Sequence, residues 1–259
     1  MELRTAALKA LEVAEPAAKA AAASALAGPA GSVDPALVLQ PPGPLPGRTE
    51  KPVLVPVHQV PRRSPFTPEG RAALLHAVAH IELNAINLAL DAVWRFPGMP
   101  EAYYRDWLQV AAEESLHFSL LAAHLQTLGH AYGDFPAHNG LWDMCARTAG
   151  DITARMALVP RTLEARGLDA TPPMQARLKQ AGDGRAVEIL DVILRDEVGH
   201  VAIGNRWYRW LCARDGLDPL AHYAELAERH RAPPLRGPFN TDARRAAGFT
   251  EDEIAALGR

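Results

Sequence analysis

The stretch from Thr67 to Arg95 constrains the fold of this chain more than any other part of the sequence. Thr67-Pro68-Glu69 is typical of a helix start, with a capping hydroxyl, a proline in the first turn and an early acid. The residues that follow are apolar almost all round the predicted helix, and such a helix is normally buried by other elements. Glu82 nevertheless lies in its middle. The fold therefore needs neighbours that cover this helix and also neutralise a buried acid.

Three further long helices are predicted, and strand signals are weak throughout. They span about 100–128, 140–166 and 185–214, and Pro160 should kink or locally unwind the second of these close to Glu164. Short helices are predicted to begin at Thr171-Pro172 and to cover 218–230. Because short connections favour antiparallel pairs, we predict an all-α fold built around a four-helix bundle.

The remaining segments are expected to flank this bundle. Residues 3–27 form a predicted alanine-rich helix that only Pro16 interrupts, whereas ten prolines within 28–66 exclude a regular repeat there. We predict three parts: an N-terminal helix and Pro-rich arm packed on the bundle (1–66), the bundle (67–231), and a tail with short helices (232–259), one starting in a capping box at Thr250. A floppy linker is the alternative to a packed arm.

Carboxylates and imidazoles recur at matching positions on the four long predicted helices. The first and third helices each offer one glutamate, and the second and fourth each offer a Glu-x-x-His pair, whose members share one helix face. The intervals between the glutamates of each hairpin are nearly equal, at 114 − 82 = 32 and 197 − 164 = 33 residues. Antiparallel hairpins would thus bring six side chains together. These are Glu82, Glu114, His117, Glu164, Glu197 and His200.

Cations would explain why acids occur on such apolar helices. A buried glutamate is destabilising by several kcal/mol, on the order of the penalty for any unpaired internal ion, and four would also repel one another. Two divalent ions balance four carboxylates, and oxygen with nitrogen donors suits iron or manganese better than zinc. Helix bundles with two iron or two manganese ions use this same ligand set, so we predict two metal ions at these six residues, iron first and manganese as the alternative. The competing interpretation is a set of solvated glutamates with incidental histidines.

Composition excludes several other classes of protein. The 259 residues are 48% hydrophobic with a formal net charge of −3, which gives no overall attraction for nucleic acid. The two cysteines indicate a reducing compartment rather than a disulfide framework. The sequence shows neither a secretory signal nor an uninterrupted apolar run of the roughly 20 residues that a membrane span needs. We expect a cytoplasmic protein, as a monomer or small homo-oligomer.

Several segments of the chain resemble a bacterial ferritin-like family of unknown function. The resemblance rests on segments of the four long helices and on two in the arm, and covers about residues 40–250. These are His80–Ala92, Glu113–Phe118, Leu158–Asp169, Arg195–Val201, Pro46–Pro52 and Val60–Arg63. It implies a ferritin-like fold with a dinuclear metal centre at the six positions. That family is similar, more distantly, to iron-dependent tRNA hydroxylases that oxidise a modified adenosine.

These features lead us to expect a di-iron oxidoreductase that activates oxygen, or peroxide, to oxidise or hydroxylate an unknown organic substrate. A tRNA substrate is disfavoured by the acidic overall charge. The alternatives are a ferroxidase or iron-handling protein, a peroxide-detoxifying protein and, outside the enzymes, a metal-free helical interaction module.

Overall fold

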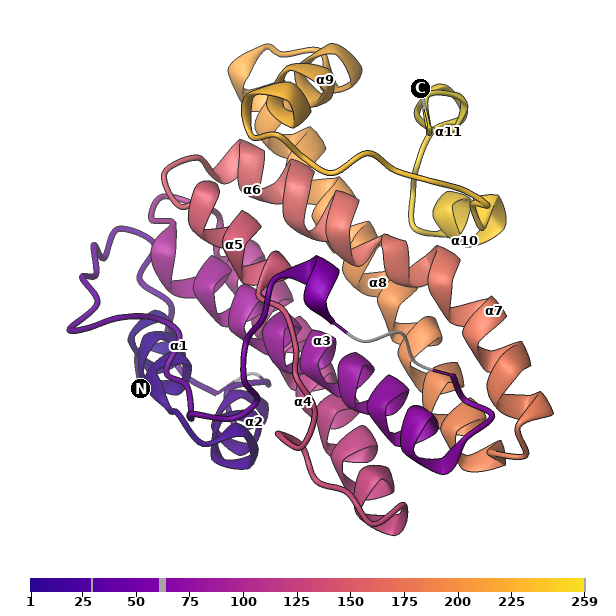
Figure 1. Ribbon diagram of the computed structural model, residues 1–259. Helices are drawn as coiled ribbons and strands as arrows, with labels where there is room; N and C mark the ends of the chain where they lie inside the picture. The colour runs from indigo at the N-terminus through magenta and orange to yellow at the C-terminus, as the bar shows by residue number, and fades with distance from the viewer. Residues whose placement is uncertain (29, 61–63, 259) are drawn as a thin grey trace. The chain divides into compact units, whose positions relative to one another are not determined.

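Helices account for the regular structure of the chain (Figure 1). The computed structural model describes residues 1–28, 30–60 and 64–258, and within them extended pairing is limited to two isolated bridges, Glu2–Ser32 and Leu54–Ala137. The predicted all-α class is therefore confirmed. Arg62 and Arg63, which belong to a segment that carries the resemblance, lie outside the described residues.

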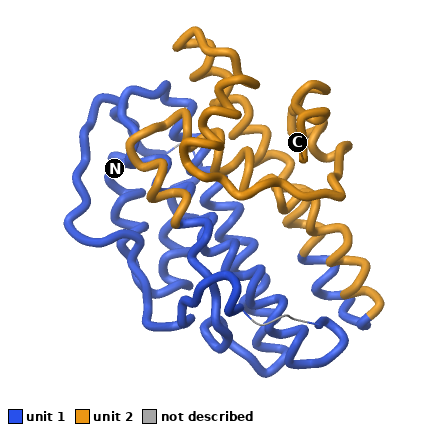
Figure 2. The backbone as a smooth tube through the Cα atoms, turned by 45° about the horizontal axis from the view of Figure 1, so that its top comes forward, with its two compact units in different colours: residues 1–142, 181–189 blue, residues 143–180, 190–259 orange. Residues whose placement is uncertain are grey.

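The chain divides into two compact units that alternate along the sequence (Figure 2). Unit 1 comprises residues 1–142 and 181–189, and unit 2 comprises residues 143–180 and 190–259. The long helix α8 (Gly184–Asp215) contributes its first residues to unit 1 and the rest to unit 2.

Unit 1 is built on two long helices, α3 (Pro68–Arg95) and α4 (Glu101–Thr127), which pack against each other. Their bounds agree with the sequence signals. The Thr67 hydroxyl accepts a hydrogen bond from the Gly70 N–H and caps α3, and Gly129 follows α4 with a φ of +79°, a conformation that glycine adopts without strain.

The N-terminal segment forms two helices where one was predicted. α1 (Leu3–Glu12) packs on α3, and α2 (Pro16–Ser24) packs mainly on α4. The chain breaks before Pro16 because proline suits a first helical turn but not a helix interior. The Glu15 carboxylate accepts hydrogen bonds from the N–H groups of Ala17 and Ala18, which stabilises the new start.

The buried side chain of Arg4 fastens α1 to the end of α3. Its guanidinium donates to the carbonyl oxygens of Val93 at 3.1 Å and Trp94 at 2.8 Å, and to that of Leu37 in the arm at 2.6 Å. α3 itself is long and apolar enough to cross a membrane, but 78% of its most apolar stretch is buried inside the protein. That burial is consistent with the core helix of a soluble protein.

The Pro-rich arm has little regular structure but is held to unit 1 by backbone hydrogen bonds. Its short helix η1 spans Val57–Gln59. The Gly47 N–H donates to the Leu11 carbonyl at 2.9 Å. Further along, the Val55 N–H donates to the Ala137 carbonyl at 2.8 Å. Backbone hydrogen bonds to other parts of unit 1 therefore fix the arm on both sides of residues 48–54.

Unit 2 contains the shorter helices of the chain and most of α8. A single helix over 140–166 is wrong: the structure has α5 (Gly140–Arg147), which begins in unit 1, then α6 (Ile152–Leu158) and the π-helix η2 (Val159–Glu164). The break precedes α6 because the Asp151 carboxylate accepts from the Ala154 N–H at 2.9 Å and starts a new helix. The local unwinding expected from Pro160 is present as η2.

The next helix, α7 (Arg166–Gln180), begins earlier than the predicted start at Thr171 and contains Pro172 and Pro173. Proline lacks an N–H, so Pro172 cannot donate to the carbonyl of Leu168 one turn earlier. The Asn240 side-chain amide donates to that carbonyl instead, at 3.2 Å. A distant residue therefore compensates for a proline that would otherwise begin the helix.

The C-terminal part completes unit 2 with α9 (Pro219–Arg229), α10 (Thr241–Ala246) and α11 (Glu251–Ala255). Residues of α7, α8 and the tail share a hydrophobic core that includes Leu168, Val201 and Phe249. The predicted capping box at Thr250 is confirmed, since the Glu253 N–H donates to its hydroxyl and its own N–H donates to the Glu253 carboxylate.

Candidate metal centre

Unit 1 brings three of the six predicted ligands together. Glu82 comes from the middle of α3, and Glu114 and His117 lie one turn apart on α4. One ligand atom of each residue lies within 4.8 Å of the others. The His117 Nδ1 atom is 3.1 Å from Glu82 Oε2 and 3.2 Å from Glu114 Oε2. All three side chains are buried, so the cluster is an internal polar group and not part of a solvated face.

Without a cation, this cluster can balance its charge only by holding protons. Burial and then the negative charge of Glu114 raise the pKa of Glu82 to about 8. Burial alone would lower the pKa of His117, but its hydrogen bonds to Glu114 and Glu82 outweigh burial and raise that pKa to about 12. Two protons on two carboxylates and an imidazole leave no net charge. One divalent ion on the deprotonated groups would achieve the same balance.

Unit 2 carries the other three predicted ligands, and all are buried. Glu164 is the last residue of η2, and Glu197 and His200 lie one turn apart on α8. Gly167 follows η2 closely, and a Cβ atom added there would lie 3.9 Å from the Glu197 carboxyl carbon. The chain just after Glu164 therefore passes beside Glu197. The convergence of all six residues on one centre stays a prediction.

Local sequence accounts for the π-helix that presents Glu164. The Ala165 N–H donates to the Pro160 carbonyl five residues earlier at 3.1 Å, and the Thr162 hydroxyl donates to the Ala157 carbonyl at 2.7 Å. Pro160 packs against Gly204 of α8, where an added Cβ would lie only 2.6 Å from the proline Cβ. Glycine at 204 thus permits the close approach that this proline needs.

Arg161 anchors η2 to the rest of unit 2. Its buried guanidinium donates to the Asn205 side-chain oxygen at 2.9 Å and to the Glu253 carboxylate at 2.5 Å. The rings of Tyr208 and Tyr223 each lie 4.9 Å from it. Burial lowers the pKa of Arg161, and the charge of Glu253 acts in the opposite direction. Side chains of α8, α9 and α11 therefore fix the element that ends in Glu164.

Polar residues on the helices that carry the predicted ligands form contacts of their own. The Asn87 side-chain oxygen accepts from Lys19 Nζ at 2.7 Å, and the Asp191 carboxylate accepts from Gln175 at 2.6 Å. His80 Nδ1 lies 2.8 Å from the Tyr132 hydroxyl, on the opposite face of α3 from Glu82. His80 thus belongs to a polar cluster with Tyr132 that is separate from the carboxylates.

Lys19 and Asp183 are among the buried polar groups of unit 1 that sequence reasoning missed. Lys19 is buried on the alanine-rich helix α2, and its small apolar neighbours were the only sign in the sequence that this part of the helix could be buried. Asp183 accepts a hydrogen bond from His124 Nε2 at 2.9 Å. In the sequence it lies in a Gly-Asp-Gly stretch just before α8, and such a stretch indicates only the end of a helix. Both pair residues far apart in the chain, so no local pattern could have found them.

Comparison with known proteins gives a family but no activity. Residues 8–255 match a family described as "Protein of unknown function (DUF455)". An uncharacterized protein of Haemophilus influenzae is 57% identical over 212 residues, which cover 79% of this chain and 74% of that protein. No solved structure matches.

Proposed function

The chain belongs to the DUF455 family, whose description names no activity, and from its buried carboxylates and imidazoles we propose a dinuclear non-haem metal oxidoreductase. The proposed centre holds two iron ions between Glu82, Glu114, His117, Glu164, Glu197 and His200. It activates oxygen to oxidise or hydroxylate an organic substrate. The fold proposed for it is ferritin-like.

The Glu82–Glu114–His117 cluster is the observation that supports this proposal most directly. Three ligand atoms within 4.8 Å of one another, all buried, form a donor set of carboxylate oxygens and one imidazole nitrogen. That set suits iron or manganese, which accept mixed oxygen and nitrogen ligands, and lacks the thiolates of structural zinc sites. The residues of unit 1 therefore fit a divalent transition metal.

The residues of the chain would hold the metals, and the metals would supply the redox chemistry. When bound, a reduced di-iron pair supplies the electrons that oxygen activation needs. The glutamates would neutralise the ions, and each Glu-x-x-His pair would contribute one oxygen and one nitrogen ligand from the same helix face. The apolar surroundings of α3 would limit the access of water to the ions.

Metal stoichiometry tests the proposal. Protein purified without added metal, and again after anaerobic addition of Fe(II), should contain about two ions per chain by elemental analysis. Glu114→Gln and Glu197→Ala should each lose most of this metal, because each removes a charged ligand. Glu113→Gln is the matched control for Glu114: its carboxylate accepts a hydrogen bond from Gln109 on α4 and lies outside the cluster.

Failure of this test has a clear meaning. Wild-type protein that stays empty after addition of Fe(II) would favour the metal-free interaction module. Full metal content in both ligand variants would place the ions elsewhere. With loaded protein, oxygen consumption that requires an added reductant fits an oxidase or oxygenase. Rapid peroxide turnover, or iron oxidation into a large hollow assembly, would instead select the detoxifying or storage alternatives.

A further inference from the structure

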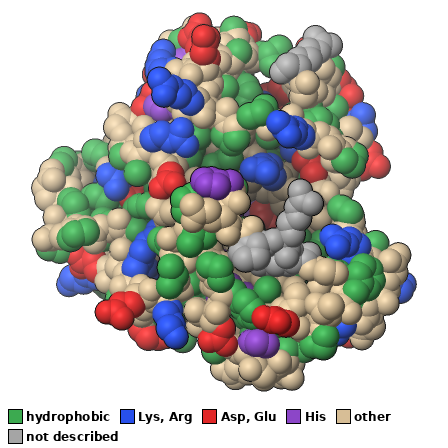
Figure 3. All heavy atoms as spheres, in the orientation of Figure 1, with side chains coloured by type: hydrophobic (Ala, Val, Ile, Leu, Met, Phe, Trp, Pro, Cys, Tyr) green, Lys and Arg blue, Asp and Glu red, His purple; other side chains and the backbone are tan. Residues whose placement is uncertain are grey.

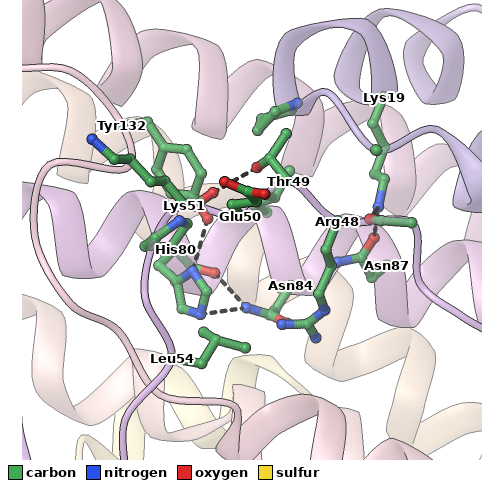
Figure 4. Close-up of a pocket in the computed structure, with 15 residues that line it drawn as sticks. Lys19, Arg48, Thr49, Glu50, Lys51, Leu54, His80, Asn84, Asn87 and Tyr132 are labelled. Carbon is green, nitrogen blue, oxygen red and sulfur yellow. Dashed lines mark hydrogen bonds between the residues drawn. The ribbon is translucent and has the colours of Figure 1, made fainter.

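A polar cavity of about 170 Å³ lies in unit 1, between the arm and helices α2 and α3 (Figure 4). Its floor includes His80, Asn84 and Asn87 of α3, and Lys19 of α2 closes one side. Residues 47–52 of the arm line it on another. Successive helix residues are about 100° apart, so His80 and Asn84 lie about 200° from Glu82 around α3. The cavity and the carboxylate cluster thus occupy different faces of that helix.

The arm forms a fixed wall of this cavity. The Gly47 carbonyl accepts from Lys19 Nζ at 2.8 Å while its N–H donates to Leu11, and a Cβ added at Gly47 would lie 2.0 Å from the Glu12 carbonyl oxygen. Only glycine permits this approach. The bridge between Leu54 and Ala137 holds the far end. The cavity is therefore pre-formed, as binding sites for small molecules usually are.

The floor of the cavity contains a buried hydrogen-bond acceptor. Asn84 is 2% exposed, and its side-chain N–H₂ donates to the His80 carbonyl at 2.8 Å, which fixes the orientation of the amide. The Asn84 Oδ1 atom has no hydrogen-bond partner among the described residues. A buried acceptor left unsatisfied is destabilising, so this position favours a ligand that brings an N–H or O–H group.

Positive charge dominates the other polar groups that line the cavity. Lys19, Arg48 and Lys51 line it together with one acid, Glu50. Burial first, and then the nearby charge of Arg48, lower the pKa of Lys19 to about 7. An anion in the cavity would favour the charged form of Lys19 and so counteract this lowering of its pKa. Figure 4 shows the Lys19 side chain directed at Asn87 and that of Arg48 beside Asn84.

We propose that this cavity binds a small organic anion that carries its own hydroxyl or amide donor. The anionic group lies toward Arg48 and Lys19, and the donor reaches Asn84 Oδ1. The size of the cavity suits a metabolite of a few carbon atoms rather than a drug-sized ligand. The proposal depends on residues of the arm and α3 that line the cavity, and it requires no metal at Glu82.

Three probes with the same three-carbon skeleton separate the two features of this ligand. Glycerate has a carboxylate and hydroxyls, propionate has only the carboxylate, and glycerol has only hydroxyls. Binding to the full chain would be measured by calorimetry and by NMR line broadening of the probe. We expect glycerate to bind more tightly than either partial probe by about tenfold, the effect of one good hydrogen bond or of one charge interaction.

Matched variants assign the two contacts. Asn84→Leu should remove the preference for glycerate over propionate, and Arg48→Ala should remove most of its preference over glycerol. Arg236→Ala, at an exposed arginine of unit 2, controls for net charge. Because Asn84→Leu could disturb α3, Gly47→Ala provides a second test: it displaces the arm and should weaken glycerate binding, whereas Gly43→Ala, with open space at its Cβ, should not.

Two results would overturn the proposal. One is equal binding of the three probes, or binding of none, by a wild-type chain with normal helicity. The other is glycerate binding that Asn84→Leu and Gly47→Ala both leave unchanged, which would place the ligand elsewhere. Loss of metal from the carboxylate cluster bears on neither result, so this proposal and the metal proposal fail separately.

Discussion

Lys19 occupies an environment that is unusual for a lysine. Lysine almost always keeps its ammonium in water, yet this side chain is 2% exposed on an alanine-rich helix. Its Nζ donates to the Gly47 carbonyl and to the Asn87 amide oxygen, and both acceptors are neutral. The structure thus holds an amine in a place that disfavours its charge.

The titration of Lys19 should make unfolding pH-dependent. Burial, with the charge of Arg48, lowers the pKa in the folded chain to about 7, against the usual 10.5. Between these values the unfolded chain binds the proton and the folded chain does not, so stability rises as pH increases from 7 toward 10. The slope from one group is at most about 1.4 kcal/mol per pH unit. Urea unfolding at several pH values measures it.

Lys19→Met should lower this slope relative to wild type, because methionine does not titrate, and the loss of two hydrogen bonds should shift stability equally at every pH. Lys9→Met, at an exposed lysine of α1, is the control and should keep the wild-type slope. Identical slopes in wild type and Lys19→Met would show that Lys19 keeps its charge in the folded chain.

Among the elements, the π-helix η2 depends most on distant contacts. It is six residues long, yet side chains of α8, α9 and α11 hold it through Arg161 and Thr162. Glu253 of α11 also accepts from Arg209 at 2.6 Å, so one carboxylate joins two arginines and its own capping box. The last short helix of the chain therefore stabilises the element that carries Glu164.

Replacement of Glu253 should be strongly destabilising for so short a helix. Glu253→Gln leaves the buried Arg161 without its counter-charge, and a broken buried pair typically lowers the free energy of unfolding by about 3–5 kcal/mol. Glu251→Gln, two residues earlier, removes a carboxylate from a solvated pair with Arg245 and should change stability little. Thermal unfolding of the two variants compares them. Equal midpoints would mean that Arg161 is satisfied without Glu253.

How well each element could be predicted follows from where its signals lie. The bounds of α3, α4 and α8 follow from caps, prolines and glycines next to their ends, all visible in the sequence. The start of α7 could not be predicted, because Asn240 compensates for Pro172 from far along the chain. The break before α6 did have a local signal in Asp151, which periodicity alone concealed.

The same distinction applies to the candidate site. The Glu-x-x-His spacing places Glu114 and His117 on one face, and the apolar surroundings of Glu82 indicate its burial. The lack of a hydrogen-bond partner for Asn84 Oδ1 could not be anticipated, since the surroundings of Asn84 depend on the path of the arm. In general the spacing of residues along helices could be read from the sequence, and contacts made by irregular segments could not.

For the whole molecule, charge is the property that bears most on its partners. The formal net charge is −3, and on the face drawn in Figure 3 basic and acidic side chains are interspersed. Nucleic-acid binding draws most of its affinity from cations that neutralise phosphates, usually gathered in a stripe or patch. The acidic net charge therefore favours small-molecule partners over tRNA.

An electrophoretic shift with total tRNA tests that preference. At about 0.15 M salt, the physiological ionic strength, we expect no retained complex, and any complex at low salt should dissociate steeply as salt increases. A basic protein of similar size that binds tRNA would serve as the positive control. A salt-resistant complex would instead indicate specific recognition of tRNA. It would make a modified adenosine in tRNA, the substrate of the tRNA hydroxylases, a candidate substrate of this chain.

The alternation of the two units along the sequence limits how this protein can be divided. Each unit is made of two stretches of chain, and the second stretch of unit 1 lies between the two stretches of unit 2. No single cleavage releases either unit intact. Any truncation that keeps all of unit 1 therefore also keeps residues 143–180 of unit 2.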